Sequence, residues 1–309
     1  MISRRQFVAR ASAAGLALSV APFSASPARA ASAQPDDRFQ DLLRGVGAFS
    51  ERGGTIGYLA TEAGLVIVDT QFPESARACY DRLDARTPDR ATPINLLVNT
   101  HHHGDHTAGN VALAGLAARH VAHEAVPGLQ RAAAVRGGSQ DAQTYPRETY
   151  SCEWSADVGD ETIALRYHGP AHTAGDSVVH FERADVVHMG DLVFNRMPCF
   201  IDLPAGATTE GWMDVLQRVH DDFSDETAFI FGHGHPDHGV VGTRADLLVM
   251  RDYLGELRQF VSAGRAAGMT EDEMVAESET HAPFDSHRFA GWPQGLPNNV
   301  RAVAEEMAR

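Results

Sequence analysis

Cysteine is scarce in this 309-residue chain, and its scarcity argues against a fold held together by disulfides. The three cysteines, Cys79, Cys152 and Cys199, form no CxxC pair and show no spacing typical of a metal site. We therefore interpret each of them as a single buried thiol. No motif around them suggests a nucleophile, and no G-x-S-x-G elbow occurs anywhere in the chain.

Long apolar runs and an excess of basic residues are missing as well. No run approaches the roughly 20 apolar residues that a membrane-spanning helix requires, so membrane insertion is not expected. The formal net charge is −15, and so acidic a surface repels nucleic acid and anionic membranes, because phosphate binding depends on lysine and arginine. We therefore expect a small-molecule substrate and no nucleic-acid partner.

The amino terminus has the composition of an export signal. Residues 3–8, Ser-Arg-Arg-Gln-Phe-Val, form a twin-arginine pattern, a mildly apolar stretch covers 11–21, and 28–30 offer a small-x-small cleavage site. An amphipathic first helix is the alternative, but it does not explain this order of features. We predict that residues 1–33 are a signal peptide and linker, recognised in transit by the twin-arginine export machinery. The mature protein is then periplasmic or secreted.

The remaining sequence alternates short β-rich runs with helical patterns. Strands are predicted within residues 44–69 and at 94–98, 161–167, 177–181, 185–189 and 227–231. Helices are predicted at 73–86, 109–118, 126–135, 210–223 and 243–261, with further helical pieces after that. No repeat or low-complexity linker interrupts this order, which suits two packed sheets with helices outside. Residues 34–309 are predicted to be one domain with a helical C-terminal extension.

A histidine-rich segment follows the strand predicted at 94–98. It reads Thr-His-His-His-Gly-Asp-His-Thr over residues 100–107. His101 and His103 are two residues apart, so in an extended chain they point the same way. Asp105 follows at the turn, and imidazole and carboxylate are usual zinc ligands. A histidine-rich surface loop explains the clustering but neither the aspartate nor the preceding strand, so we interpret the segment as a metal site.

The H-x-H-x-D-H spacing over residues 101–106 resembles the signature of the metallo-β-lactamase superfamily. The pattern of that family continues with a later histidine, an aspartate after glycine and a final histidine after glycine. This chain offers them in order as His172, Asp191 and His233. The resemblance implies an α+β fold, an αββα sandwich, in which two mixed β-sheets pack face to face with helices on the outer faces.

The resemblance also implies a site with two zinc ions. Three histidines would hold one ion, an aspartate and two histidines would hold the other, and a further aspartate would bridge them. In order, these ligands are His101, His103 and His172, then Asp105, His106 and His233, then Asp191. Two such ions lower the pKa of a shared water, so a bridging hydroxide would attack a carbonyl carbon. Asp105 would be the catalytic residue that orients the hydroxide and accepts its proton.

Other polar residues lie next to these motifs in the sequence. Residues 233–238 repeat the H-x-H-x-D-H spacing, which leaves His235 and His238 open as surface residues, entrance residues or alternative ligands. His188 and Asp176 adjoin expected ligands. Because a metal-bound imidazole needs an acceptor for its second N–H, we expect these two residues to support the ligands.

The residues that would meet the substrate are less specific. In the commonest zinc β-lactamases, a cysteine fills the position of Asp191 and a lysine three residues later grips the substrate carboxylate. Here that later residue is Phe194, and Arg196 is the available substitute. Phe194 and Trp154 are expected to line an apolar entrance. The aspartate is more similar to glyoxalase II, lactonases and related esterases, although the basic C-terminal region of glyoxalase II has no match here.

Together these motifs predict a zinc-dependent hydrolase of an ester, thioester, lactone or β-lactam. Two alternatives stay open. The first is an iron-dependent oxidoreductase similar to persulfide dioxygenases, and the second is a non-catalytic periplasmic metal-binding accessory protein. The complete second ligand set argues against the first alternative, because persulfide dioxygenases resemble a mononuclear site.

Overall fold

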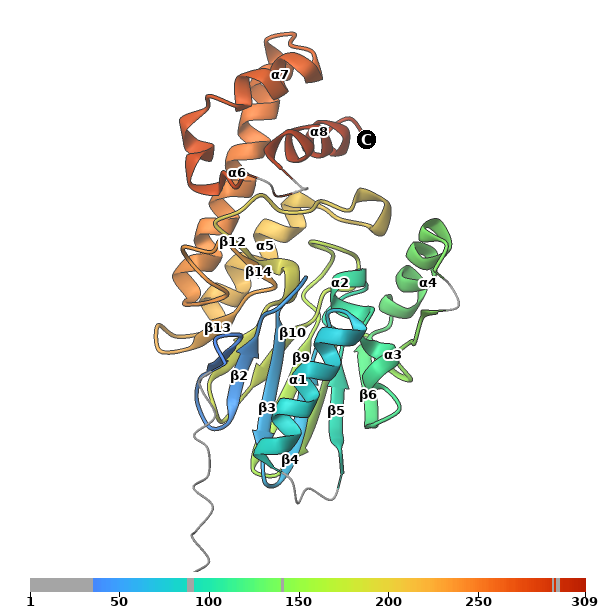
Figure 1. Ribbon diagram of the computed structural model, residues 1–309. Helices are drawn as coiled ribbons and strands as arrows, with labels where there is room; N and C mark the ends of the chain where they lie inside the picture. The colour runs from blue at the N-terminus through green and yellow to red at the C-terminus, as the bar shows by residue number, and fades with distance from the viewer. Residues whose placement is uncertain (1–35, 88–91, 140–141, 291, 293–294) are drawn as a thin grey trace, which may run out of the picture. The chain divides into compact units, whose positions relative to one another are not determined.

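Two β-sheets lie face to face in residues 37–309, and helices cover their outer faces (Figure 1). The computed structural model describes residues 36–309 except 88–91, 140–141, 291 and 293–294. The predicted signal segment, residues 1–33, lies outside the described residues. Within the described part of the chain, no helix has the length and apolarity needed to cross a membrane.

The first sheet holds seven strands in sequence order. They are β1 (Phe39–Asp41), β2 (Val46–Phe49), β3 (Ile56–Thr61), β4 (Gly64–Val68), β5 (Ile94–Val98), β6 (Ala117–His123) and β7 (Glu148–Tyr150). The first four strands pair antiparallel, and β4 to β7 pair parallel. Parallel pairing brings the carboxyl ends of β4 and β5 to the same edge, where the metal-site motif begins.

The second sheet has the strand order β15-β13-β11-β10-β9-β8, and only β11 and β13 pair parallel. Its strands are β8 (Glu153–Val158), β9 (Glu161–Arg166), β10 (Val178–Phe181), β11 (Val186–His188), β13 (Ala228–Ile230) and β15 (Val241–Gly242). A separate parallel pair joins β12 (Phe194–Asn195) to β14 (His233–Gly234). This pair ties the segment after β11 to the segment after β13.

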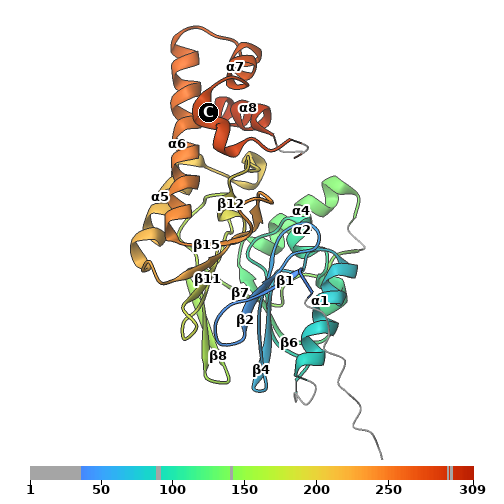
Figure 2. The same ribbon diagram turned by 60° about the vertical axis from the view of Figure 1, so that its left-hand side comes forward.

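Helices pack against both outer faces. The first sheet is covered by α1 (Pro73–Arg86) and α3 (Asn110–Leu113), and the second by α5 (Thr209–Asp222) and α6 (Arg244–Ala266). The C-terminal α7 (Glu271–Ser278) and α8 (Leu296–Glu306) pack beside α6 (Figure 2). The short elements are α2 (Gly104–Thr107), α4 (Val126–Gly137), η2 (Gly190–Leu192), η3 (Leu203–Ala205) and η4 (Ala282–His287). The order of layers is therefore the αββα sandwich that the resemblance implies.

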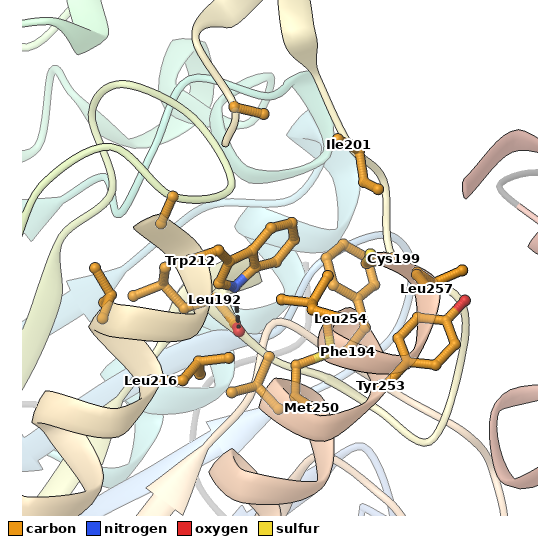
Figure 3. Close-up of a cluster of buried hydrophobic side chains, with 14 of the residues drawn as sticks. Leu192, Phe194, Cys199, Ile201, Trp212, Leu216, Met250, Tyr253, Leu254 and Leu257 are labelled. Atoms are coloured by element: carbon orange, nitrogen blue, oxygen red, sulfur yellow. Dashed lines mark hydrogen bonds between the residues drawn. The ribbon is translucent and has the colours of Figure 1, made fainter. Parts of the chain in front are cut away.

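The sequence of α5 explains how it covers the second sheet. Trp212, Leu216 and Val219 recur at the spacing that places side chains on one side of a helix, and all three are buried. The Thr208 hydroxyl caps the helix by accepting a hydrogen bond from the Gly211 amide. The buried side of α5 meets side chains of α6 in one apolar cluster (Figure 3). This cluster reaches the metal-site loops, because it includes residues 192–203.

Most of the predicted elements are present, and two have exact bounds: α1 covers 73–86 and β5 covers 94–98. The helix predicted at 109–118 is wrong. It ends after the short α3, and β6 begins at Ala117 because its residues pair with β5, for example Val121 with Val98. Sheet pairing thus overrides the helical propensity of an alanine-rich segment. The exposed thiol of Cys152, between β7 and β8, also differs from expectation.

We predict that the α6 face is a main source of stability. Leu254 is fully buried against the second sheet, so Leu254→Ala should lower the free energy of unfolding by about 2–5 kcal/mol. Leu43→Ala is the control, because Leu43 is 54% exposed and its loss should change that energy by less than about 0.5 kcal/mol. Urea unfolding measures both variants. Equal losses would show that α6 contributes no more than an exposed loop.

Candidate metal centre

All seven predicted ligands meet at one end of the sandwich, beside α2, β12 and β14 (Figure 1). They are carried by loops and short turns that follow β5, β9, β11 and β13. Asp105 and His106 lie on α2, and Asp191 lies on η2. Residues separated by more than 130 positions are thus brought together because several strands end at the same edge.

Four of these side chains form a first group: His101, His103, His172 and Asp191. The Nδ1 atom of His103 lies 3.0 Å from His101 Nε2 and 2.9 Å from His172 Nε2. The Asp191 Oδ2 atom lies 3.7 Å from His101 Nε2 and 3.6 Å from His172 Nε2. Three imidazole nitrogens and one carboxylate oxygen therefore surround a single point.

The second group consists of Asp105, His106 and His233, and Asp191 reaches it as well. The Asp105 Oδ2 atom lies 3.1 Å from His233 Nε2 and 3.9 Å from His106 Nε2. Asp191 places Oδ1 2.9 Å from His106 Nε2 and Oδ2 3.4 Å from His233 Nε2. Asp191 is thus the one carboxylate among the seven that contacts both groups.

Hydrogen-bond acceptors fix the orientation of four of the five ligand imidazoles. His172 Nδ1 donates to the Phe200 carbonyl at 2.9 Å, and His103 Nε2 donates to Asp202 Oδ2 at 3.0 Å. A carbonyl or a carboxylate can only accept, so in each neutral ring the other nitrogen carries the lone pair. Those lone pairs, on His172 Nε2 and His103 Nδ1, both point into the first group.

Asp69 fixes two more imidazoles in the same way. Its carboxylate accepts hydrogen bonds from the Thr100 amide at 2.8 Å, from the Thr100 hydroxyl at 2.6 Å and from His106 Nδ1 at 2.7 Å. Because the Thr100 hydroxyl donates to Asp69, it accepts from His101 Nδ1 at 3.0 Å. His101 and His106 therefore also turn their Nε2 atoms toward the centre. The backbone of Asp69 is left-handed, with φ 63°, an unfavourable conformation of the kind found at functional sites.

This donor set fits metal ions. Neutral imidazole lone pairs only 3 Å apart have no hydrogen to share, and a cation resolves the conflict. His106 Nε2 and Asp191 Oδ1 are buried and 2.9 Å apart, and among the described residues neither has a hydrogen-bond partner other than the other. Nitrogen and carboxylate oxygen are the ligands of zinc and similar ions. The residues can thus hold a metal in each group.

When no metal is bound, burial and nearby charges shift the pKa values of the two groups in different directions. Burial lowers the pKa of His172 to about 3, so this ring is neutral at pH 7. Burial also lowers the pKa of His233, but the Asp191 charge and hydrogen bonds to the carboxylates outweigh it and raise the pKa to about 9. Burial raises the pKa of Asp191, yet neighbouring imidazolium groups hold it well below its usual range. The second group therefore carries protons that a metal would replace.

Two glycines make room for the ligands. A Cβ atom at Gly54 would lie 2.2 Å from His106 Nε2, and one at Gly232 would lie 2.0 Å from Asp191 Oδ1. Any other residue at these positions would force the ligand to move. The backbone also holds the two loops together, since the Thr55 amide donates to the Gly232 carbonyl at 2.8 Å.

The three residues predicted to contact the substrate have different surroundings in the structure. The Phe194 ring stacks on His233, with centroids 5.1 Å apart, and it is buried, so it supports a ligand. The Arg196 guanidinium pairs with Asp246 at 3.0 Å. Trp154 lies on the edge strand β8, where its indole donates to Glu148. Existing partners account for Arg196 and Trp154, so we leave both out of the candidate site.

The structure also corrects the expected supporting residues. His188 contacts the Thr55 carbonyl and the Gly190 amide, and Asp176 accepts two hydrogen bonds from Thr173. Each therefore shapes a loop beside a ligand, and no described hydrogen bond runs to either of them from a ligand imidazole. The true acceptors are Asp69, Thr100, Asp202 and the Phe200 carbonyl.

Of the residues missed by sequence reasoning, Asp69 had a signal, because it directly follows the apolar run of β4 at the edge where β5 ends. Asp202 and Phe200 lie on an irregular loop that no sequence pattern marks. His235 and His238 remain outside both groups. Of the two copies of the spacing, at 101–106 and 233–238, the two groups contain the first copy and only His233 of the second.

Comparison with known proteins agrees with this geometry. The family model described as the Metallo-beta-lactamase superfamily matches residues 50–235, which include all seven ligands. The chain belongs to this superfamily. A metallo-β-lactamase from Pontibacter korlensis has a similar fold, with a TM-score of 0.57 and 18% identity, covering 70% of this chain and 98% of that one.

Two other similar proteins are longer than this chain. A sec-alkylsulfatase from Pseudomonas sp. aligns with a TM-score of 0.67 and 18% identity, covering 86% of this chain and 49% of that one. The 2,4-dinitroanisole O-demethylase subunit alpha of Nocardioides sp. (strain JS1661) is 30% identical over 147 residues, which is 45% of this chain and 43% of the relative. This chain thus spans about half the length of these relatives or less.

We predict that zinc binding to this superfamily member releases protons. With a pKa of about 9, His233 is protonated at pH 7 in the metal-free protein, and zinc must displace that proton. The apparent affinity should therefore rise with pH below about pH 9, about tenfold per pH unit for each proton displaced. Calorimetry in buffers of different ionisation enthalpy counts the released protons. A pH-independent affinity with no proton release would contradict the assignment.

Proposed function

We propose that this superfamily member is a hydrolase that uses two zinc ions. The observation that carries the proposal is the convergence of imidazole lone pairs and carboxylates into two adjoining groups. His101, His103 and His172 would hold one ion, and Asp105, His106 and His233 would hold the other. Asp191 would bridge them, since its two oxygens contact both groups. When bound, such ions acidify a water and polarise a substrate oxygen.

Asp105 is the residue best placed to accept a proton during the reaction. Burial raises its pKa, but the charge on His106 and a hydrogen bond from His233 outweigh burial and lower the pKa to about 2. Asp105 is thus a carboxylate at neutral pH. Its side chain is 31% exposed, whereas that of Asp191 is 4% exposed, so only Asp105 is open to solvent and substrate. General-base catalysis needs such an accessible, ionised group.

A cavity beside His233 supports a small substrate with an apolar part. Its volume is about 260 Å³, and its walls include Met197, Phe289, Trp292 and Arg52. The Trp292 ring lies 5.2 Å from the His233 ring, so a molecule in the cavity would sit next to the second group. Arg52 lies over the Phe72 ring and brings a positive charge to this acidic protein.

For the bond that is broken, we propose a carbonyl ester, thioester, lactone or β-lactam. The names of two relatives add an aryl ether and a secondary alkyl sulfate as further candidate substrates. In each of the six, water can displace an oxygen, sulfur or nitrogen leaving group. A panel with one compound of each class, run with zinc-loaded protein, tests the proposal. Absence of hydrolysis across the panel despite bound zinc would favour an accessory metal-binding role.

We predict that His103→Ala loses zinc and hydrolysis together. His103 Nδ1 lies between two other ligand nitrogens, so its removal opens the first group. Turnover of any substrate found in the panel should fall at least about 100-fold, since even partners of ligands cost 10–100-fold. His220→Ala is the control, because that ring contacts Asp221 at the end of α5. A His103→Ala protein with full zinc content and activity would remove the ligand assignment.

We also propose that the chain is exported through the twin-arginine machinery to the periplasm or the medium. The support is the order of arginine pair, apolar stretch and cleavage pattern in residues 3–30. Replacing Arg4 and Arg5 with lysine should retain the uncut chain in the cell, because the arginine pair is the recognised feature. Fractionation and mass measurement check this. Normal export of the double variant would contradict the proposal.

A further inference from the structure

Residues 198–202, here called the acceptor loop, connect the metal centre with the C-terminal helices. The loop follows β12 and has no regular secondary structure. Its backbone carbonyls must therefore find partners outside a helix or sheet. Three consecutive carbonyls, those of Pro198, Cys199 and Phe200, accept side-chain hydrogen bonds. Each of these bonds comes from a distant part of the chain.

One side of the acceptor loop serves the first ligand group. The Phe200 carbonyl accepts from His172 Nδ1 at 2.9 Å, and Asp202 accepts from His103 Nε2 at 3.0 Å. The Phe200 ring also lies 5.1 Å from the His103 ring. The loop therefore sets the orientation of two of the three imidazoles in the first group.

The other side of the loop is held by residues near the C-terminus. Asn299 of α8 donates from Nδ2 to the Cys199 carbonyl at 2.6 Å, and Trp292 donates from Nε1 to the Pro198 carbonyl at 2.8 Å. Asn299 is itself fixed, because its Oδ1 accepts from the Tyr253 hydroxyl of α6 at 2.7 Å. Asn299 and Cys199 are both buried, so water cannot replace these bonds.

Apolar packing reinforces the connection. Cys199 and Ile201 belong to the same buried cluster as Tyr253 and Leu257 of α6, and Figure 3 shows them on the segment that passes these side chains. The superfamily match ends at residue 235, so α6 and α8 lie beyond it. The C-terminal helices thus add hydrogen bonds and packing to a loop that lies within the matched region.

We propose that the C-terminal helical segment is part of the metal centre, with Asn299 as a positioning residue for His103 and His172. Asn299 holds the Cys199 carbonyl, and this fixes the next peptide unit, whose carbonyl accepts from His172. The loop has no regular secondary structure, so side-chain hydrogen bonds of this kind hold its backbone carbonyls. Groups that orient metal ligands change metal affinity without touching the metal. The inference rests on the proposed metal site but not on any particular substrate.

The test is zinc affinity, measured by competition with a chromophoric chelator, in full-length variants. Asn299→Leu keeps a similar volume but removes the donor to Cys199. It should weaken zinc binding about tenfold, the lower end of the range for residues that support ligands. The visible spectrum of the cobalt-substituted protein should change as well, because the imidazoles are no longer held in one orientation.

Val303→Ala is the matched control. Val303 lies one turn after Asn299 on α8, is fully buried in the same cluster and has no polar side-chain atom. Its truncation should lower the unfolding midpoint but leave zinc affinity and the cobalt spectrum unchanged. Trp292→Phe is a milder second variant, since it keeps an aromatic ring beside His233 and removes the donor to Pro198. Trp292→Phe should also weaken zinc binding, and it provides the test if Asn299→Leu does not fold.

The outcomes separate the two proposals. Wild-type protein that binds no zinc would overturn the proposed function, and the inference with it. Wild-type protein that binds two zinc ions, with unchanged affinity in Asn299→Leu or Trp292→Phe, would overturn the inference alone. An equal loss of affinity in Val303→Ala would overturn it too, because the effect would then follow stability and not the acceptor loop.

Discussion

The metal centre depends on one constraint: four of its five ligand imidazoles donate one N–H to a protein acceptor and turn the other ring nitrogen toward the centre. Asp69, acting partly through Thr100, orients His101 and His106. The loop at 198–202 orients His103 and His172. Rings arranged in this way crowd their lone pairs together, which is unfavourable without a cation. The hydrogen bonds of the fold therefore hold the ring nitrogens in positions that suit a metal ion.

The sandwich supplies that arrangement through strand ends. β4 and β5 run parallel, so Asp69 and the histidine motif emerge side by side, and β11 and β13 do the same for Asp191 and His233. Two segments close in on the ligands where only glycine fits, at Gly54 and Gly232. The same layers leave the second group next to a small cavity with aromatic walls. The metal centre and the adjoining cavity thus both lie at one edge of the two sheets.

The sequence predicted the layers and all seven members of the two groups, because apolar periodicity marks strands and the ligand motifs are closely spaced. It failed where a contact joins distant irregular segments. Asp202 lies in a loop without any pattern, and Phe200 acts through its carbonyl, which every residue has. For Trp154 and Arg196 residue type alone suggested a substrate contact, and the structure shows each with a partner within the protein, Glu148 and Asp246.

The most direct test of this account is the anomalous X-ray scattering of zinc-loaded crystals at the zinc absorption edge. We expect two peaks, one within bonding distance of His101 Nε2, His103 Nδ1 and His172 Nε2, the other beside the second group. Asp191 should lie between them. Zinc bound elsewhere, for example at His235 and His238, with both groups empty, would contradict the claim that the oriented lone pairs form a metal centre.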